Sequence, residues 1–148
     1  MIRYKFSKKQ DQEFTATLRS RVNSYFQEND LNRDANTTMF FKSICLFTWY
    51  LTPYFILIFS GITSIPALMS LWVIMGLGKA FIGTAVMHDS LHGSYSNNKR
   101  VNFWMGLSAM IIGVDSLIWK IQHNVIHHTY TNIEHTDEDI LPRFVFEL

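Results

Sequence analysis

No charged side chain occurs between Ser43 and Gly78, and this feature limits the folds open to the chain more than any other. A helix needs about 20 residues to cross the hydrocarbon core of a bilayer, with about 17 as a lower limit. Two hydrophobic segments, residues 43–59 and 67–87, are joined by the uncharged residues 60–66. Because a lipid-exposed backbone has to satisfy its own hydrogen bonds, we expect an all-α membrane protein with a transmembrane helical hairpin.

Residues 1–39 are expected to form a cytosolic, amphipathic N-terminal segment. Within residues 9–28, apolar side chains recur at three- and four-residue steps, which predicts a helix with one apolar face. These apolar residues are Phe14, Leu18, Val22, Tyr25 and Phe26. We expect this face to pack on the protein itself, with attachment to the membrane surface as the alternative. Residues 1–36 contain no apolar core of the length that a signal peptide has.

A third apolar stretch, residues 101–119, contains Asp115 and is loosened by Gly106 and Gly113. One more crossing would place the histidines before and after it on opposite sides of the membrane. We therefore expect an interfacial or re-entrant helix. Trp119, with Lys120 after it, suits an interfacial anchor.

Basic residues are distributed unevenly around the hydrophobic segments. Several precede the first segment, Lys99 and Arg100 follow the second, and the connector between the segments has none. The positive-inside rule therefore predicts that the N-terminus and the histidines after the hairpin are cytoplasmic. The total of 13 basic and 12 acidic residues gives no support for a nucleic-acid partner, and the single cysteine excludes a disulfide within the chain.

Five histidines have the spacing of metal ligands, namely His88, His92, His123, His127 and His128. Residues four apart share one face of a helix, so His88 with His92, and His123 with His127, can each hold one ion. His128 points about 100° away from His127 on a helix, so we expect it to reach a second ion or another side of the site. Ionisable groups beside a membrane segment are costly, and metal ligation explains them.

The ligand type alone does not select the metal, because imidazole binds iron, zinc, copper and nickel. A helical zinc protease carries Glu beside its first histidine, whereas these positions hold Asp89 and Asn124. Zinc-dependent hydrolysis therefore lacks its general base. A redox metal is favoured by the membrane location, and a structural or transport zinc site is the alternative.

Two sequences resemble the first and second histidine boxes of the membrane fatty acid desaturases. They are residues 87–96, MHDSLHGSYS, and residues 119–132, WKIQHNVIHHTYTN. The chain is most similar to bacterial acyl-CoA desaturases of the front-end, linoleoyl-CoA desaturase-like type. Residues 138–140, and in a weaker way residues 4–7 and 19–26, also fit that group.

The resemblance implies a cytoplasm-facing site in which histidines hold two iron ions. Such proteins insert a double bond into a fatty acyl chain with dioxygen as co-substrate and two electrons from an external donor. The implied iron ligands are His88, His92, His123, His127 and His128, and the implied residues that orient them by hydrogen bonds are Asp89 and Asn124. The resemblance also implies a membrane lipid or acyl-CoA substrate, a ferredoxin or cytochrome b5-type donor, and a bacterial inner membrane.

The family pattern includes a third histidine box and a second membrane hairpin downstream, which are not found in residues 1–148. Residues 40–148 are therefore expected to be the N-terminal part of a desaturase domain that is inactive alone. His135, in an acidic region, is not expected to be a ligand. The alternatives are a di-iron membrane hydroxylase or monooxygenase with the same histidine chemistry, and a non-catalytic membrane metal-binding protein.

Overall fold

The structure is a computed structural model that describes residues 11–137, 139 and 140, and these residues form helices and turns without a strand. The chain divides between Arg33 and Asp34 into two compact units. The first unit contains α1 (Gln12–Glu28), which confirms the helix expected within residues 9–28 over its described part. The similarity noted at residues 4–7 lies outside the described residues.

Helix α1 keeps its apolar side chains exposed within its own unit. Phe14, Leu18, Val22 and Tyr25 all have large exposed fractions, and α1 has no buried residue. The helix ends where the side-chain amide of Asn29 donates to the Tyr25 carbonyl at 2.8 Å. The Arg33 guanidinium then lies 4.9 Å from the centre of the Phe26 ring, a cation–π contact that folds the following turn back on the helix.

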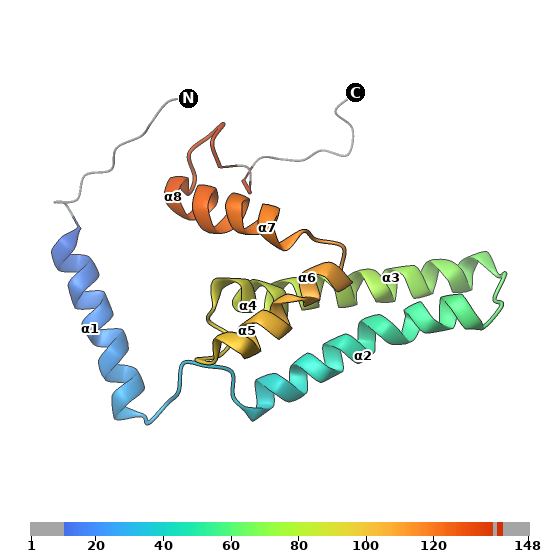
Figure 1. Cartoon of the computed structure of the whole chain (residues 1–148), viewed down its shortest axis with the longest axis horizontal. Helices are drawn as coiled ribbons and strands as arrows, with labels where there is room; N and C mark the ends of the chain where they lie inside the picture. Colours follow the sequence, from blue (N-terminus) through green and yellow to red (C-terminus); the bar gives the residue numbers. More distant parts are fainter. Residues whose placement is uncertain (1–10, 138, 141–148) are drawn as a thin grey trace. The chain divides into compact units, whose positions relative to one another are not determined.

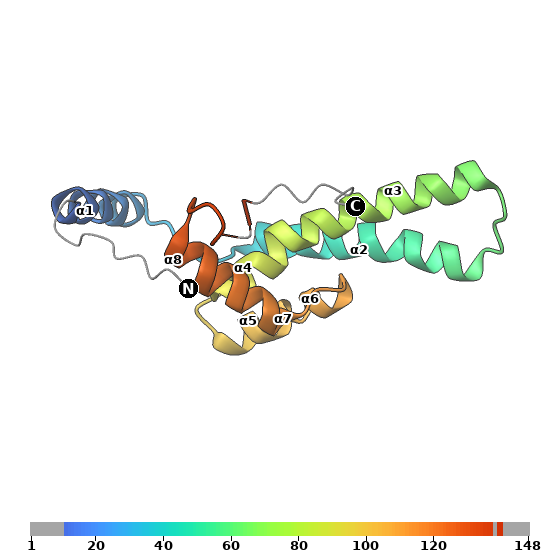
Figure 2. The ribbon, with the colours of Figure 1, turned by 90° about the horizontal axis from the view of Figure 1, so that it is seen from above.

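The second unit begins with a hairpin of two long helices, shown side by side in Figures 1 and 2. Helix α2 (Thr37–Phe59) starts earlier than expected because the Asn36 side chain accepts a hydrogen bond from the Met39 N–H and caps it. Helix α3 (Ile65–Ile82) continues through the π-helix η1 (Gly83–Met87) into α4 (His88–His92). The two helices, Thr37–Phe59 and Ile65–His92, are each long and apolar enough to span a membrane.

The two hairpin helices approach closely where α3 has a glycine. A Cβ atom on Gly78 would lie 3.1 Å from the Tyr50 Cα atom, so only glycine leaves room for this approach. Nearby, the Trp49 indole N–H donates to the Ile74 carbonyl at 3.0 Å. Many large apolar side chains point outward along the hairpin, including Phe55, Ile58, Phe59, Trp72 and Val73. Outward apolar side chains suit a hairpin whose solvent is lipid.

After the hairpin, the chain forms two short arms that meet at a sharp bend. The first arm contains α5 (Lys99–Gly106) and α6 (Ser108–Ile111), and the second contains α7 (Ser116–Trp119), η2 (Lys120–His127) and α8 (His128–Tyr130). The arms are bent by 111° relative to each other. Gly113 adopts a positive φ of 76° at the bend, and the Asp115 carboxylate caps α7 by accepting from the backbone N–H groups of Leu117 and Ile118.

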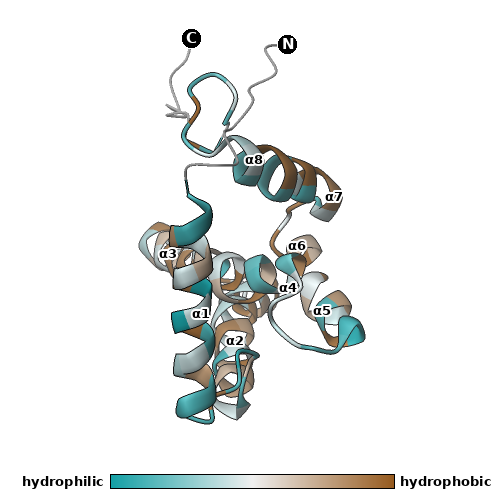
Figure 3. Cartoon of the chain, turned by 90° about the vertical axis from the view of Figure 1, so that its left-hand side faces the viewer, coloured by the Kyte–Doolittle hydropathy of each residue, from teal (hydrophilic) through white to brown (hydrophobic). Residues whose placement is uncertain are grey.

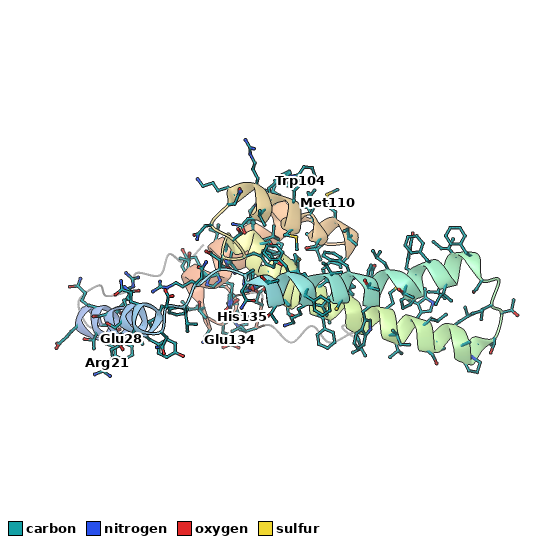
Figure 4. The ribbon with its side chains drawn as sticks, turned by 90° about the horizontal axis from the view of Figure 1, so that it is seen from below. Arg21, Glu28, Trp104, Met110, Glu134 and His135 are labelled. Carbon is teal, nitrogen blue, oxygen red and sulfur yellow. The ribbon has the colours of Figure 1, made fainter. Side chains whose placement is uncertain are left out.

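This bend refines the expectation for residues 101–119, which form several short helices in place of one. Gly113 and Asp115, the residues that made a simple crossing implausible, are the ones that form the bend. The first arm carries exposed Trp104 and Met110, which project from its outer side in Figure 4.

A small core fastens the first arm and the loop after α4 to the hairpin. Ile82, Val86 and Ile112 are buried together there. Tyr95 is buried as well, and its hydroxyl hydrogen-bonds with the Ser43 hydroxyl at 2.8 Å. The Tyr95 carbonyl accepts from the Ala35 N–H at 2.9 Å. The start of α2 is therefore tied to the loop that follows the first histidine pair.

Replacement of Gly78 with valine should destabilise the hairpin, because the new side chain would meet the α2 backbone at Tyr50. We expect a loss of about 1–3 kcal/mol, the usual cost of overpacking. The measurement is thermal unfolding in detergent micelles followed by circular dichroism. Gly76→Val is the matched control, since a Cβ atom on Gly76 meets nothing within 4 Å. Equal melting temperatures for the two variants would contradict the close packing at Gly78.

Candidate metal centre

The first histidine pair lies at the end of the second membrane-length helix. His88 and His92 are in α4, and the centres of their rings are 4.5 Å apart. Just before them, the Thr84 hydroxyl donates to the Ala80 carbonyl at 3.0 Å, at the start of the π-helical turn η1. Competition of this kind for a helix carbonyl disturbs regular α-helical bonding. π-Turns are frequent at functional sites, and this one directly precedes the helix that carries the first histidine pair.

The second pair lies in the π-helix η2 of the second arm. The rings of His123 and His127 are stacked, with centres 5.0 Å apart and an interplanar angle of 20°. The wider π-helical turn keeps these two side chains close to one direction. Leu117, Ile118, Ile121 and Val125 are exposed on the same arm, and Figure 3 shows an apolar stripe beside a polar one from α7 to α8. The arm is thus amphipathic, with its histidines on the polar side.

The two pairs come together in one cluster of five imidazoles. The His123 ring centre lies 5.1 Å from those of both His88 and His92. His128 packs against His92, with Nε2 atoms 3.4 Å apart. Two nitrogens bound tetrahedrally to one ion at about 2.1 Å are about 3.4 Å apart, so this spacing suits a shared metal ion.

Two overlapping groups of side chains bring ligand atoms close together, and in the second of them Asp139 already contacts the Nδ1 atom of His123. In one group, the ligand atoms of His88, His92 and His123 all lie within 4.8 Å of one another, and in the other those of His123, His127 and Asp139 do. His123 belongs to both groups. His128 contacts His92, whereas His127 contacts Asp137 on the acidic side of the cluster.

Three of the histidines have a carboxylate within hydrogen-bonding distance of the Nδ1 atom. His88 is paired with Asp89 at 3.1 Å, His123 with Asp139 at 2.6 Å and His127 with Asp137 at 2.9 Å. A carboxylate oxygen accepts hydrogen bonds, so these contacts favour the imidazole tautomer that carries its proton on Nδ1. Nε2 then keeps its lone pair for a metal ion, which is the arrangement found behind most metal-bound histidines.

Asp137 is fully buried, yet it is held in the ionised form. Burial raises the pKa of this carboxyl group, but the hydrogen bond from His127 and those from the backbone N–H groups of Asn132 and Asp139 outweigh it. The net result is a pKa below the usual value for aspartic acid. The Asp137 carboxylate is therefore a fixed negative charge at the edge of the imidazole cluster.

Trp119 covers one side of the cluster. Its ring is stacked on His123 with centres 4.4 Å apart, and it meets His88 and His92 edge-on. The sequence suggested only an interfacial anchor at this position, because ring packing between helices leaves no sequence pattern. In the structure this indole restricts the orientation of three imidazoles and shields them on that side.

Asn124 links the two histidine segments to each other. Its side-chain amide donates to the Leu91 carbonyl at 3.2 Å. Leu91 also packs on Gly106, where an added Cβ atom would lie 3.1 Å from the Leu91 side chain. Asp89 does contact a histidine, whereas His135 is 85% exposed and belongs to neither ligand group.

The donor set fits iron held by imidazoles. The cluster offers five histidine rings, three with Nδ1 on a carboxylate, and neutral imidazole is a good ligand for iron as well as zinc and copper. The buried Asn124 Oδ1 atom has no hydrogen-bond partner among the described residues, which adds a polar atom beside the cluster.

A family model described as fatty acid desaturase matches residues 63–147, more than half of the chain. The chain belongs to the fatty acid desaturase family. The match includes both histidine segments and the turn that carries Asp137. No solved structure matches the chain with significance.

Curated relatives extend the similarity to nearly the whole chain. An acyl-lipid (8-3)-desaturase of Physcomitrium patens is 33% identical over 132 residues, 88% of this chain and 27% of the relative. The sn-1 linoleoyl-lipid 6-desaturases of Arthrospira platensis and a Synechocystis strain are 34% and 30% identical, over 86% and 93% of this chain. The chain spans 34% and 38% of those two relatives, so it corresponds to about a third of their length.

Replacement of His123 with alanine should weaken iron binding more than any other single histidine change, because its ring centre lies within 5.1 Å of the ring centres of His88, His92, His127 and His128. We expect ferrous affinity to fall by more than about tenfold, at least as much as the loss of an outer partner causes. The measurement is an anaerobic titration of the detergent-solubilised chain against a chromogenic chelator. His135→Ala is the control and should bind iron as the native chain does. Similar losses in both variants would argue against the cluster as the binding site.

Proposed function

We propose that the protein to which this chain contributes is an oxygen-dependent fatty acyl desaturase of lipid metabolism. The observation that carries the proposal is the convergence of five imidazoles from two separate segments at the end of a membrane-length helix. Membership of the desaturase family supports it. In this proposal two iron ions are held by residues that include His88, His92, His123, His127 and His128.

The roles of the chain's own groups follow from the contacts. The imidazole Nε2 atoms bind the metal, and the carboxylates of Asp89, Asp137 and Asp139 hold the Nδ1 protons and so set each ring's orientation. Trp119 shields one side of the cluster from water. Dioxygen activation for removal of hydrogen from an unactivated methylene is the chemistry that iron supplies when it is bound.

The substrate is proposed to be a fatty acyl chain carried on a membrane lipid or on coenzyme A. Names of the relatives refer to acyl lipids and to linoleoyl lipid, which supports the first carrier. A cavity of about 320 Å³ lies beside His92, and its walls come from α4, Gly93 and both arms. An acyl chain in the bilayer could reach the histidine cluster from this side, because the first arm carries exposed apolar residues.

The reaction requires electrons that the substrate does not supply. Removal of two hydrogen atoms from the acyl chain and reduction of dioxygen to two waters need two further electrons from a donor and two protons from solvent. We propose an external donor of the ferredoxin or cytochrome b5 type.

The N-terminus and both histidine segments are proposed to face the cytoplasm, in a bacterial inner membrane. Support comes from the basic residues that flank the hairpin, Lys42 on one side and Lys99 and Arg100 on the other, while residues 60–66 carry no charge. The bend between the arms supports a shared side for the two histidine segments, because it lets the second arm return to the first pair.

This orientation predicts which positions a membrane-impermeant thiol reagent reaches. In a Cys45→Ser background, Thr63→Cys in the connector should be labelled in intact cells, and Glu134→Cys only after permeabilisation. Labelling of both variants after permeabilisation is the control for reactivity. Labelling of Glu134→Cys in intact cells would place the histidine segments on the outer side.

The reaction class is tested by product analysis of the protein that contains this chain, expressed with an electron donor in a host that lacks the product. Mass spectrometry of fatty acid derivatives should show a new double bond, and His127→Ala should abolish it. A hydroxylated acid in place of the olefin would identify a hydroxylase. Zinc in place of iron in the purified protein, together with the absence of any oxidised product, would support the non-catalytic alternative.

A further inference from the structure

The turn after α8, residues 131–137, folds back on the second histidine segment and places one buried carboxylate against it. Three backbone hydrogen bonds shape this turn: Ile133 N–H to Tyr130, and the N–H groups of Thr136 and Asp137 to Ile133. Asn132 adopts a φ of 63° and His135 a φ of 62°, so the turn includes two left-handed residues. Asp137 is the point at which the turn meets the imidazole cluster.

Both carboxylate oxygens of Asp137 make hydrogen bonds with groups of the protein. Both carboxylate oxygens lie 2.9 Å from His127 Nδ1. One oxygen also accepts from the Asn132 N–H at 2.9 Å and the other from the Asp139 N–H at 3.1 Å. The side chain is 0% exposed, so water does not compete for these bonds. The two backbone bonds fix the carboxylate plane, and the carboxylate in turn fixes the imidazole.

We propose that Asp137 is a positioning residue that locks His127 as the Nδ1–H tautomer and directs its Nε2 lone pair into the metal centre. The inference rests on the proposed function only in taking His127 as a metal ligand. Asp139 does the same for His123 from a more exposed place, since its side chain is 35% exposed. Neither role was visible in the sequence, where both residues belong to an acidic run.

The different burial of Asp137 and Asp139 predicts how strongly each substitution weakens metal binding. An outer carboxylate behind a metal-bound histidine typically contributes about 10- to 100-fold to metal affinity. We expect Asp137→Asn to weaken ferrous binding by about that factor, and Asp139→Asn to weaken it less because water can replace the exposed carboxylate. Glu134→Gln is the matched control. It removes the same charge from the same turn, but Glu134 is 83% exposed and lies 3.8 Å from His135, which is labelled beside it in Figure 4.

The first experiment is a double-mutant cycle of iron affinity with the full chain in detergent micelles. Ferrous iron is titrated anaerobically against a chelator for the native chain, Asp137→Asn, His127→Ala and the double variant. If Asp137 acts through His127, its substitution should have no further effect once His127 is absent. A purely structural role in the turn would make the two losses additive, and this result would overturn the proposal.

The same cycle separates this inference from the proposed function. Unchanged affinity in His127→Ala would remove His127 from the metal centre, and the proposed function would lose a ligand. A loss in His127→Ala with no loss in Asp137→Asn would overturn the positioning role alone. Glu134→Gln should match the native affinity within about twofold, since outer partners that touch no ligand contribute little.

The second experiment is carried out without metal, and the result that decides it is read on the native chain. Nitrogen-15 NMR of histidine-labelled chain distinguishes the two neutral tautomers of each ring, with His127→Gln used to assign the signal. We expect the Nδ1–H tautomer for His127 in the native chain and a mixture in Asp137→Asn. An Nε2–H tautomer in the native chain would overturn the proposal. Circular dichroism reports whether the Asp137→Asn chain keeps its helices.

Discussion

One continuous helix, Ile65–His92, has to serve two environments, and the arrangement of the site depends on this constraint. Its first part is apolar enough to span a bilayer, and its last turn carries His88 and His92. Since the helix does not break between these parts, the first histidine pair is held at a fixed distance beyond the apolar segment. The remaining histidines can then join the site only if the chain returns to this helix end.

The return is achieved by packing and hydrogen bonding between the two arms and the hairpin. Buried Ile112 fastens the first arm to the end of α3 at Ile82 and Val86, and the bend at Gly113 and Asp115 reverses the chain. The Asn124 amide then reaches the Leu91 carbonyl, between the two histidines of the first pair in sequence. Each contact is modest alone, with a net value of about 1 kcal/mol for a hydrogen bond. Together they restrict where His123 and His127 can lie.

Much of this architecture could be predicted from residue patterns, and the misses have physical causes. The absence of charge from Ser43 to Gly78 predicted the hairpin, and helical spacing predicted that the histidines pair. Spacing could not show that η1 and η2 are π-helical, because the widened turn depends on competing hydrogen bonds such as that of Thr84. The spacing of the residues also gave no sign that Asp137 and Asp139 contact histidine rings. Contacts of that kind follow from how a turn folds back.

The π-helical form of η2 has a consequence for how this segment tolerates length changes in related genes. A π-turn holds one more residue between bonded backbone groups than an α-turn does. Loss of a single codon between His123 and His127 would leave the two rings three residues apart, and in a helix of unchanged type this would swing the following ring by about 100° around the axis. Point substitutions at exposed positions such as Val125 leave this geometry alone. In the second histidine segment, insertions and deletions should therefore be tolerated less well than point substitutions at exposed positions.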